Sequence, residues 1–416
     1  MKRYFPVFCI ALFIVSCKPQ NTKTEPVSGI WRGTIALNDT INLPFNFEWT
    51  SRDSAYSMTI MNGEERINTD RIENKGDSLI IHLPVFANYF IVKKGAERMD
   101  GYYINPDAEN YRLPFNAMAN DSSRFKTSAK NCCEINEKWA VKFSPGTKDE
   151  SPAIGYFQQE GTTVSGTFMT ETGDYRYLEG ILSGDQLQLS AFDGAHLFYF
   201  KATIDGSQKM EGRFFSGRSW SEPWIGYRDD EFTLRNADSL TYLKEGYPTV
   251  EFSFPDTKGN THSLNDERYK GKPVIVQIMG SWCPNCMDES RHLREVYKQY
   301  NKDGLEIVAL TFERAKDKET AVERAVKMKE DLELPYPVLM AGYTRADKAG
   351  EALPMLNHVM SFPTSIYLDK DHKVVSVHTG YSGPGTPVYD KYVADNKLLV
   401  ERIVYQNQGG QKAENL

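Results

Sequence analysis

The sequence predicts an all-β domain followed by an α/β domain, and three observations predict this order. From Gly29 to Tyr227, short alternating apolar and polar runs are separated by Gly, Asn and Asp turns, as in a barrel or sandwich. From Thr249 the pattern changes to continuous apolar runs and amphipathic stretches, as in a buried sheet covered by helices. A chain of 416 residues is long enough for both domains.

The N-terminus is typical of an export signal. A cationic start precedes the apolar run Tyr4–Val15, which is too short to span a bilayer core of roughly 30 Å. The run ends in small residues before Cys17, which resembles a bacterial lipobox. We therefore expect residues 1–16 to be a lipoprotein signal peptide, Cys17 to carry lipid and residues 17–27 to form a polar tether. An ordinary cleaved signal with an accidental cysteine is the alternative.

The β-rich domain is expected over residues 28–228 and shows internal similarity. The segments that match in the same order are Gly76–Ile81 with Gly184–Leu189, Met99–Tyr103 with Met210–Phe214, and Trp31 with Trp139. We interpret them as a duplication, with halves over 28–120 and 137–228 joined by Asp121–Asn136. The alternative is that β-hairpins with Gly-Asp turns look alike. Clustered aromatic residues suit a barrel or sandwich with a pocket.

After a linker over residues 229–248, the second domain is expected over 249–416. Strands are expected over Val274–Met279, Leu305–Phe312, Pro337–Met340, Ser365–Leu368 and Val374–His378, and helices over Pro284–Asn301, Asp317–Leu332 and Val388–Val404. Two strand–helix units followed by an antiparallel strand pair and a closing helix give the order of the thioredoxin fold.

The chemistry is expected at Cys283-Pro284-Asn285-Cys286, where a strand ends and a helix begins. A helix N-terminus stabilises a thiolate through its dipole and free N–H groups, and a proline is tolerated in the first turn. Cys286 follows on the same helical face. Cys283 is therefore expected to attack a partner disulfide, and Cys286 to resolve the mixed disulfide.

Other uses of the cysteines are less consistent with the sequence. A structural zinc site needs two more ligands, and the sequence has no second CxxC and no histidine pair at metal spacing. We expect no metal and no other cofactor.

The net charge of −7 argues against nucleic acid as the main partner, because phosphate binding needs a basic face.

The adjacent residues Cys132 and Cys133 remain open to interpretation. Neighbouring Cα atoms lie about 3.8 Å apart, below the usual disulfide range of roughly 4.4–6.8 Å. The pair is interpreted as buried thiols, as a strained vicinal disulfide in the linker, or as a redox relay with Cys283.

A second element of the site is Phe362-Pro363-Thr364, directly before an expected strand. In a thioredoxin-like fold this proline is cis and faces the CxxC motif, and its backbone neighbours pair with an extended substrate chain. Pro363 is therefore expected at the site.

The span from Thr249 to about Val404 resembles the TlpA/ResA-like branch of the thioredoxin superfamily. The matching segments, in order, are Phe252–Asn260, Leu264–Gly271, Trp282–Cys286, Phe362–Thr364 and Asp369–Lys373. The resemblance implies functional carboxylates at Glu289 and Glu313, and a membrane-tethered, extracytoplasmic protein kept reduced by a membrane electron-donor thiol protein. Many members serve cytochrome c maturation.

The sequence also departs from this family. The common Phe-Trp-Ala before the motif is Ile278-Met279-Gly280, and the segment Met340–Ser361 is longer than usual. Both departures concern the identity of the partner more than the chemistry. The β-rich half has no counterpart in the minimal members, so it inherits no function.

Physical reasoning assigns roles to two residues near the cysteines. Glu289 lies one helical turn past Cys286, where a partly desolvated carboxyl group can take the proton of that thiol. A solvated helix position is the alternative. Trp282 is expected to shield the sulfur and shape its rim, with simple packing as the alternative.

The predicted function is thiol–disulfide exchange by a lipid-anchored protein of the cell envelope, facing the periplasm and reducing protein disulfides. A peroxiredoxin-like peroxidase needs a Thr-x-x-Cys with an upstream proline, and Gly280 and Val276 occupy those positions. The alternative is a binding lipoprotein whose β-rich domain carries the main function. The sequence leaves open the substrate, the direction of exchange and the membrane that holds the anchor.

Overall fold

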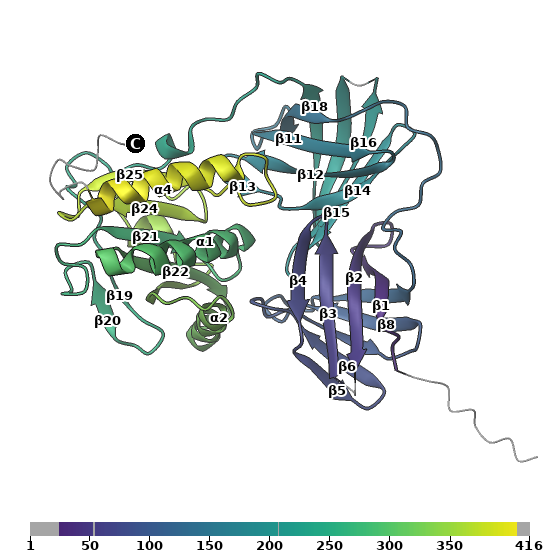
Figure 1. The fold of residues 1–416 in the computed structure, drawn as a ribbon, viewed down its shortest axis with the longest axis horizontal. Helices are drawn as coiled ribbons and strands as arrows, with labels where there is room; N and C mark the ends of the chain where they lie inside the picture. The colour runs from purple at the N-terminus through teal and green to yellow at the C-terminus, as the bar shows by residue number, and fades with distance from the viewer. Residues whose placement is uncertain (1–24, 53–54, 207, 406–416) are drawn as a thin grey trace, which may run out of the picture.

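The computed structural model describes residues 25–52, 55–206 and 208–405. These residues form two β-units and an α/β domain, which Figure 1 colours from purple through teal to yellow. The expected signal peptide, Cys17 and most of the tether lie outside the described residues. Within the described residues, none of the helices has the length and apolar character needed to cross a membrane.

The first β-unit is an antiparallel sheet in the order β4-β3-β2-β1-β9-β8-β7-β6-β5. Its strands are β1 (Gly29–Ala36), β2 (Asn42–Arg52), β3 (Ala55–Asn62), β4 (Glu65–Thr69), β5 (Ile72–Lys75), β6 (Ser78–His82), β7 (Tyr89–Lys93), β8 (Arg98–Ile104) and β9 (Arg112–Ala119). Because β1 pairs with both β2 and β9, the two ends of the segment meet in the middle of the sheet.

The second β-unit is a closed barrel. Its strands are β10 (Glu137–Phe143), β11 (Ser151–Glu160), β12 (Thr163–Thr170), β13 (Gly173–Asp174), β14 (Leu178–Ser183), β15 (Gln186–Phe192), β16 (Leu197–Asp205), β17 (Lys209–Ser216) and β18 (Trp220–Arg228). Closure occurs because β12 pairs with both β11 and β14. Stacked aromatic rings fill the interior, with centroids 4.6 Å apart for Phe168 and Phe200 and 4.3 Å apart for Phe200 and Phe214.

The two β-units are similar, which confirms the expected pair of halves. Aligning β1 with β10 and β9 with β18 gives the same strand order in both units. Trp31 and Trp139 are fully buried, and each indole N–H donates to a carbonyl four residues earlier, at 2.9 and 3.1 Å. At Gly101 and Gly212, a Cβ atom would lie 2.0 and 2.2 Å from a carbonyl oxygen of the neighbouring strand. A duplication as the origin of this likeness stays a prediction.

The α/β domain contains a sheet in the order β23-β22-β21-β24-β25. Its strands are β21 (Val274–Met279), β22 (Glu306–Ala315), β23 (Val338–Thr344), β24 (Thr364–Leu368) and β25 (Val374–Thr379), and a hairpin of β19 (Ser253–Pro255) and β20 (Thr261–Ser263) precedes them. The first three strands are parallel, whereas β24 and β25 are antiparallel to their neighbours. All five sheet strands fall where the sequence predicts them.

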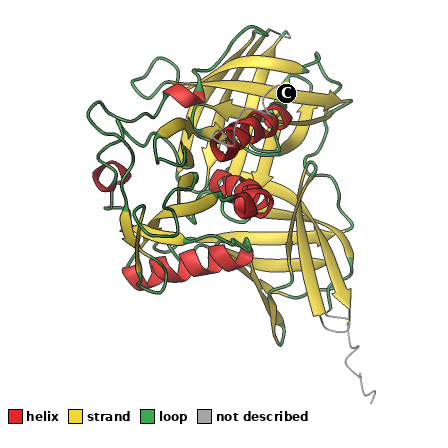
Figure 2. Ribbon diagram, turned by 60° about the vertical axis from the view of Figure 1, so that its left-hand side comes forward, coloured by secondary structure: helices red, strands yellow, loops and turns green. Residues whose placement is uncertain are grey.

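The long helices belong to this domain (Figure 2). They are α1 (Pro284–Tyr300), α2 (Lys318–Asp331) and α4 (Tyr389–Tyr405), with the short α3 (Ala349–Ala352), and 3-10 turns at η1 (Ala237–Ser239) and η2 (Asn301–Asp303). The long helices pack on one face of the sheet, and the segments around Phe252, Tyr269 and Leu356 cover the other. The linker over 229–248 is an irregular connector that contains η1.

The β-units dock onto the α/β domain through loops. Val85, after β6, belongs to the apolar core formed with α1 and α2, and its N–H donates to Asp331 at 2.8 Å. Asp107, after β8, pairs with Arg324 of α2 at 3.0 Å. These contacts join one end of the first β-unit to α2.

Candidate active site

Cys283 and Cys286 form a disulfide at the start of α1, with Cα atoms 5.3 Å apart. Cys283 is the residue that caps the helix, and its sulfur lies 3.2 Å from the backbone N of Cys286, which donates to it. Pro284 occupies the first turn, where a missing N–H leaves no bond unmade. Cys283 is only 4% exposed and Cys286 is fully buried, so a partner must approach through a narrow opening.

The segment before β24 lies opposite the cysteines. The Phe362–Pro363 peptide bond is cis, and the Phe362 carbonyl oxygen lies 3.3 Å from the Cys283 sulfur. The ring of Phe362 packs 5.4 Å from that of Trp282. This arrangement places a backbone acceptor directly beside the sulfur that the sequence predicts to be the nucleophile.

Glu289 lies one turn further along α1 and is fully buried. Gln277 of β21 donates an amide hydrogen bond to one carboxyl oxygen at 2.8 Å, and Ser365 of β24 donates its hydroxyl to the other at 2.9 Å. Burial raises the pKa of Glu289 to about 7, although both hydrogen bonds act in the opposite direction. The solvated-helix alternative for this residue is therefore wrong.

Gln277 and Ser365 were not singled out from the sequence. The one sequence signal for this site is the amide side chain of Gln277, which lies within the otherwise apolar strand β21. Ser290 donates its hydroxyl to the Gln277 carbonyl oxygen at 3.1 Å, which orients the amide so that its N–H₂ group faces Glu289. A buried polar group needs hydrogen-bond partners, so an amide within an apolar strand indicates that a carboxylate or a backbone group is buried next to it.

Glu313 is also buried, but it holds the backbone before the motif. Its carboxyl group accepts hydrogen bonds from the N–H and hydroxyl of Ser281 and from the hydroxyl of Thr311. Burial raises its pKa. Trp282 donates its indole N–H to the Phe312 carbonyl at 2.9 Å, and this hydrogen bond to the end of β22 fixes the ring beside the cysteines.

The comparison with known proteins now identifies the family. The family described as Redoxin matches residues 244–395. "Thiol-disulfide oxidoreductase ResA" of Bacillus thuringiensis subsp. konkukian (strain 97-27) is 34% identical over 133 residues, which are 32% of this chain and 68% of that protein. This chain belongs to the ResA-like thiol–disulfide oxidoreductases.

A second relative agrees with that membership. "Thiol-disulfide oxidoreductase ResA" of Geobacillus kaustophilus (strain HTA426) is 31% identical over 140 residues, covering 34% of this chain and 72% of that protein. A crystal structure of a thiol:disulfide interchange protein, thioredoxin family protein, from Chlorobium tepidum TLS is 21% identical, covers 39% of this chain and 99% of that chain, and has a TM-score of 0.30.

The barrel contributes residues that sequence reasoning about the ResA-like domain missed. The loop from Glu171 to Tyr177 places Arg176 against α1, where its guanidinium forms ion pairs with Asp288 and with Glu65 of the first β-unit. In the same loop, Asp174 accepts the Gly383 N–H at 2.7 Å, and burial raises its pKa to about 6. These partners are separated by more than a hundred residues, so no local sequence pattern signals them.

Cys132 and Cys133 lie in the linker between the β-units, with sulfur atoms 2.7 Å apart. Cys132 is exposed and Cys133 half-buried, so the interpretation as buried thiols is wrong for Cys132. Both line a cavity with Gly161, at the end of β12 opposite the loop that touches α1. The eight residues of β12 separate this cavity from the loop that touches α1 and span roughly 26 Å. Cys132 and Cys133 are therefore too far from Cys283 for direct exchange. No cluster suited to a metal ion occurs among the described residues.

Proposed function

We propose that this enzyme reduces disulfides of protein substrates outside the cytoplasm through Cys283 and Cys286. The observation that carries the proposal is the position of Cys283, which caps α1 and faces the carbonyl of the cis Phe362–Pro363 bond. A capping sulfur receives the N–H groups and positive end of the helix, which favour the thiolate.

In the reaction, the Cys283 thiolate attacks one sulfur of the substrate disulfide, and the other substrate sulfur leaves and takes a proton. The Cys286 thiolate then attacks the Cys283 sulfur and releases the second substrate thiol. The substrate gains two electrons and two protons, and the enzyme ends as the Cys283–Cys286 disulfide. Its regeneration needs a dithiol donor, for which we propose a membrane electron-donor thiol protein.

Glu289 is proposed to take the proton of Cys286 during resolution. It follows Cys286 by one turn of α1, and a carboxyl group whose pKa is about 7 exchanges protons readily near neutral pH. Trp282 is proposed to shape the rim of the site, and Pro363 to hold the backbone that meets the substrate.

The direction of exchange is tested by the reduction potential of the Cys283–Cys286 couple. A value near −270 mV, about that of thioredoxin, supports a reductase, whereas a value near −120 mV would make the protein an oxidant.

The roles of the two cysteines are tested by single alanine variants. Cys283→Ala should abolish exchange, and Cys286→Ala should accumulate mixed disulfides with substrates, because only the capping sulfur starts the reaction. Mixed disulfides are detected by mass spectrometry of non-reduced samples. Equal trapping by both variants would contradict this assignment.

Anchoring through Cys17 is part of the proposal and rests on the sequence. Lipid chains contribute about 0.8 kcal/mol per buried CH₂, which is enough for stable attachment when several are present. Cys17→Ala should move the protein from the membrane fraction to the soluble envelope fraction. A variant that stays with membranes, together with a mature wild-type N-terminus other than Cys17, would refute the lipoprotein assignment.

A further inference from the structure

Two arginines lie at the same edge of the sheet as the reactive cysteine. Cys283 comes after β21, Arg314 lies at the end of β22 and Arg345 directly follows β23. The three strands are parallel, so their carboxyl ends meet at one edge, the place where α/β proteins bind ligands. Both arginines therefore lie at the edge of the sheet that carries the motif, where they line one cavity together with Trp282.

Within the described part of the chain, these two guanidinium groups have no acidic partner. Arg314 lies over the ring of Trp282, 3.2 Å from its centroid. Among the described residues, no hydrogen bond or ion pair reaches the side chain of either arginine. Burial and the nearby charge of Arg345 lower the pKa of Arg314 to about 10. Two like charges next to each other, without a carboxylate between them, form a site of positive potential.

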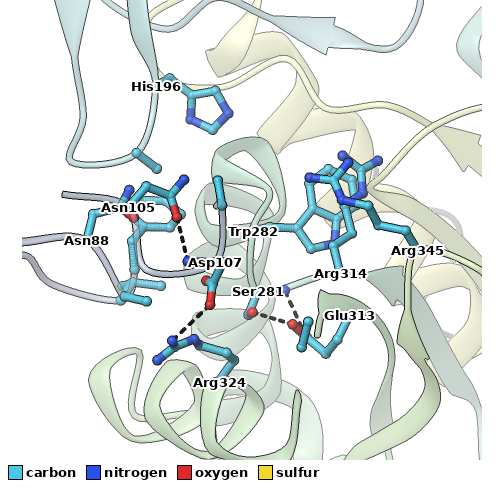
Figure 3. A pocket seen from close by; sticks show the side chains of 16 residues that line it. Asn88, Asn105, Asp107, His196, Ser281, Trp282, Glu313, Arg314, Arg324 and Arg345 are labelled. Carbon is cyan, nitrogen blue, oxygen red and sulfur yellow. Dashed lines mark hydrogen bonds and ion pairs between the residues drawn. The ribbon is translucent and has the colours of Figure 1, made fainter. Parts of the chain in front are cut away.

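Both guanidinium groups lie beside Trp282 (Figure 3). They line a cavity of about 240 Å³. Its acidic groups are already engaged, because Glu313 accepts from Ser281 and Asp107 pairs with Arg324. The cavity thus carries an excess of positive charge next to the motif.

The β-units form the opposite wall of this cavity. Phe86 and Asn105 come from loops of the first unit, and His196 comes from a loop of the second. Ser281 and Trp282, the two residues directly before Cys283, also line this cavity, so a substrate segment that occupies it next to the motif lies close to Arg314 and Arg345. This arrangement gives the β-rich half a role in choosing substrates.

We propose that Arg314 and Arg345 form an anion-binding subsite that receives an acidic side chain next to the disulfide of a polypeptide substrate. The inference rests on the proposed exchange function and names the substrate class for the same site. A carboxylate fits because guanidinium groups bind it with directed, charge-assisted hydrogen bonds.

The experiment measures second-order rate constants for reduction of matched disulfides by the pre-reduced full chain. Two peptide disulfides differ only in Asp or Asn beside the cysteine, and two small disulfides, 3,3′-dithiodipropionate and 2-hydroxyethyl disulfide, test a free carboxylate. A partly exposed ion pair contributes up to about fivefold, so two contribute up to about 25-fold together, and we expect the Asp peptide to be favoured by roughly tenfold within that limit. This preference should fall as salt is added, because the charges are partly exposed.

In the Arg314→Gln/Arg345→Gln variant, the ratio of Asp to Asn rates should fall to about one, and Arg345→Gln alone should lower it part of the way. Arg213→Gln, an exposed position on β17 outside the cavity, is the matched control and should keep the wild-type ratio.

The outcomes separate this inference from the proposed function. If wild type reduces neither peptide, the exchange function fails. If wild type reduces both peptides equally and shows no preference for dithiodipropionate, the subsite is refuted while the exchange function stands. A preference for dithiodipropionate without one for the Asp peptide would refute a polypeptide as the source of the carboxylate.

Discussion

At the scale of single residues, Glu289 shows how the fold changes a side chain's chemistry. The carboxyl group is fully buried between α1, β21 and β24, and its two hydrogen-bond donors are neutral. Neutral donors only partly offset the loss of water around a negative charge. Its pKa of about 7 is a consequence of this environment.

Glu289→Gln should slow exchange at neutral pH and raise the apparent pKa that governs resolution by Cys286. Gln retains the volume and hydrogen bonding of the side chain but accepts no proton. The measurement is a pH–rate profile of single-turnover exchange for wild type and variant. Superimposable profiles would remove Glu289 from the reaction.

The same variant has a second readout in stability. The carboxyl group titrates near 4.5 when unfolded and near 7 when folded, so the folded wild type binds an extra proton between these values. Wild-type stability therefore falls as pH rises through this window, whereas Gln does not titrate. From pH 4.5 to 8, the stability of the variant relative to wild type should rise by about 3 kcal/mol. Denaturant unfolding at several pH values measures this trend, and a constant difference would contradict the raised pKa.

At the scale of elements, the loop from Glu171 to Tyr177 joins the barrel to α1. Ser361, before the cis bond, donates its hydroxyl to the Thr172 carbonyl at 2.6 Å. Gly173 has a φ of 142°, which favours glycine, and a Cβ atom there would also lie 2.4 Å from the side-chain nitrogen of Asn285, so another residue would strain the backbone and displace Asn285. The loop therefore contacts both halves of the site, the motif and the cis-proline segment.

Arg176→Gln should destabilise this junction by about 3–5 kcal/mol, because it leaves the buried carboxylate of Glu65 without its cation and Asp288 with Arg291 alone. Arg235→Gln is the matched control. Arg235 pairs with Glu171 of the same loop but is 64% exposed, so its loss should change stability by less than about 1 kcal/mol. Denaturant unfolding of both variants measures the difference. Equal, small effects would show that the Arg176 pairs do not hold the junction.

At the scale of the whole molecule, the α/β domain has a complete sheet and helix set of its own. Residues 249–416 should therefore fold and exchange disulfides as a fragment. The fragment loses the contact with Val85, whose burial contributes roughly 1.5–3 kcal/mol, so it should unfold at lower denaturant than the full chain. Circular dichroism and an exchange assay measure both properties. A fragment without helical signal would show that the β-units supply part of its core.

Val85 also illustrates what docking requires of the backbone. Its φ of 63° lies in the left-handed region, which a β-branched residue rarely adopts. The residue is nevertheless buried in the core of the α/β domain. The surrounding contacts, including the bond from its N–H to Asp331, hold this conformation.

The sequence by itself determined the elements and the identity of the reactive pair. Burial on one or both faces leaves a period in the local sequence, so the strands of the α/β sheet were located to within a few residues. A Cys-Pro-Asn-Cys run between a buried strand and an amphipathic helix likewise has one local solution, with the first cysteine at the helix N-terminus.

Only the tertiary structure decided which side chains surround that pair. Several side chains around the pair come from segments far apart in the chain, namely Gln277 and Ser365 around Glu289, Arg176 beside α1, and Arg314 with Arg345. Such meetings depend on how whole elements and domains pack, and packing leaves no periodic signal in any one segment. A local pattern can therefore show that a residue is buried, whereas the partner that makes its burial useful is set by the fold.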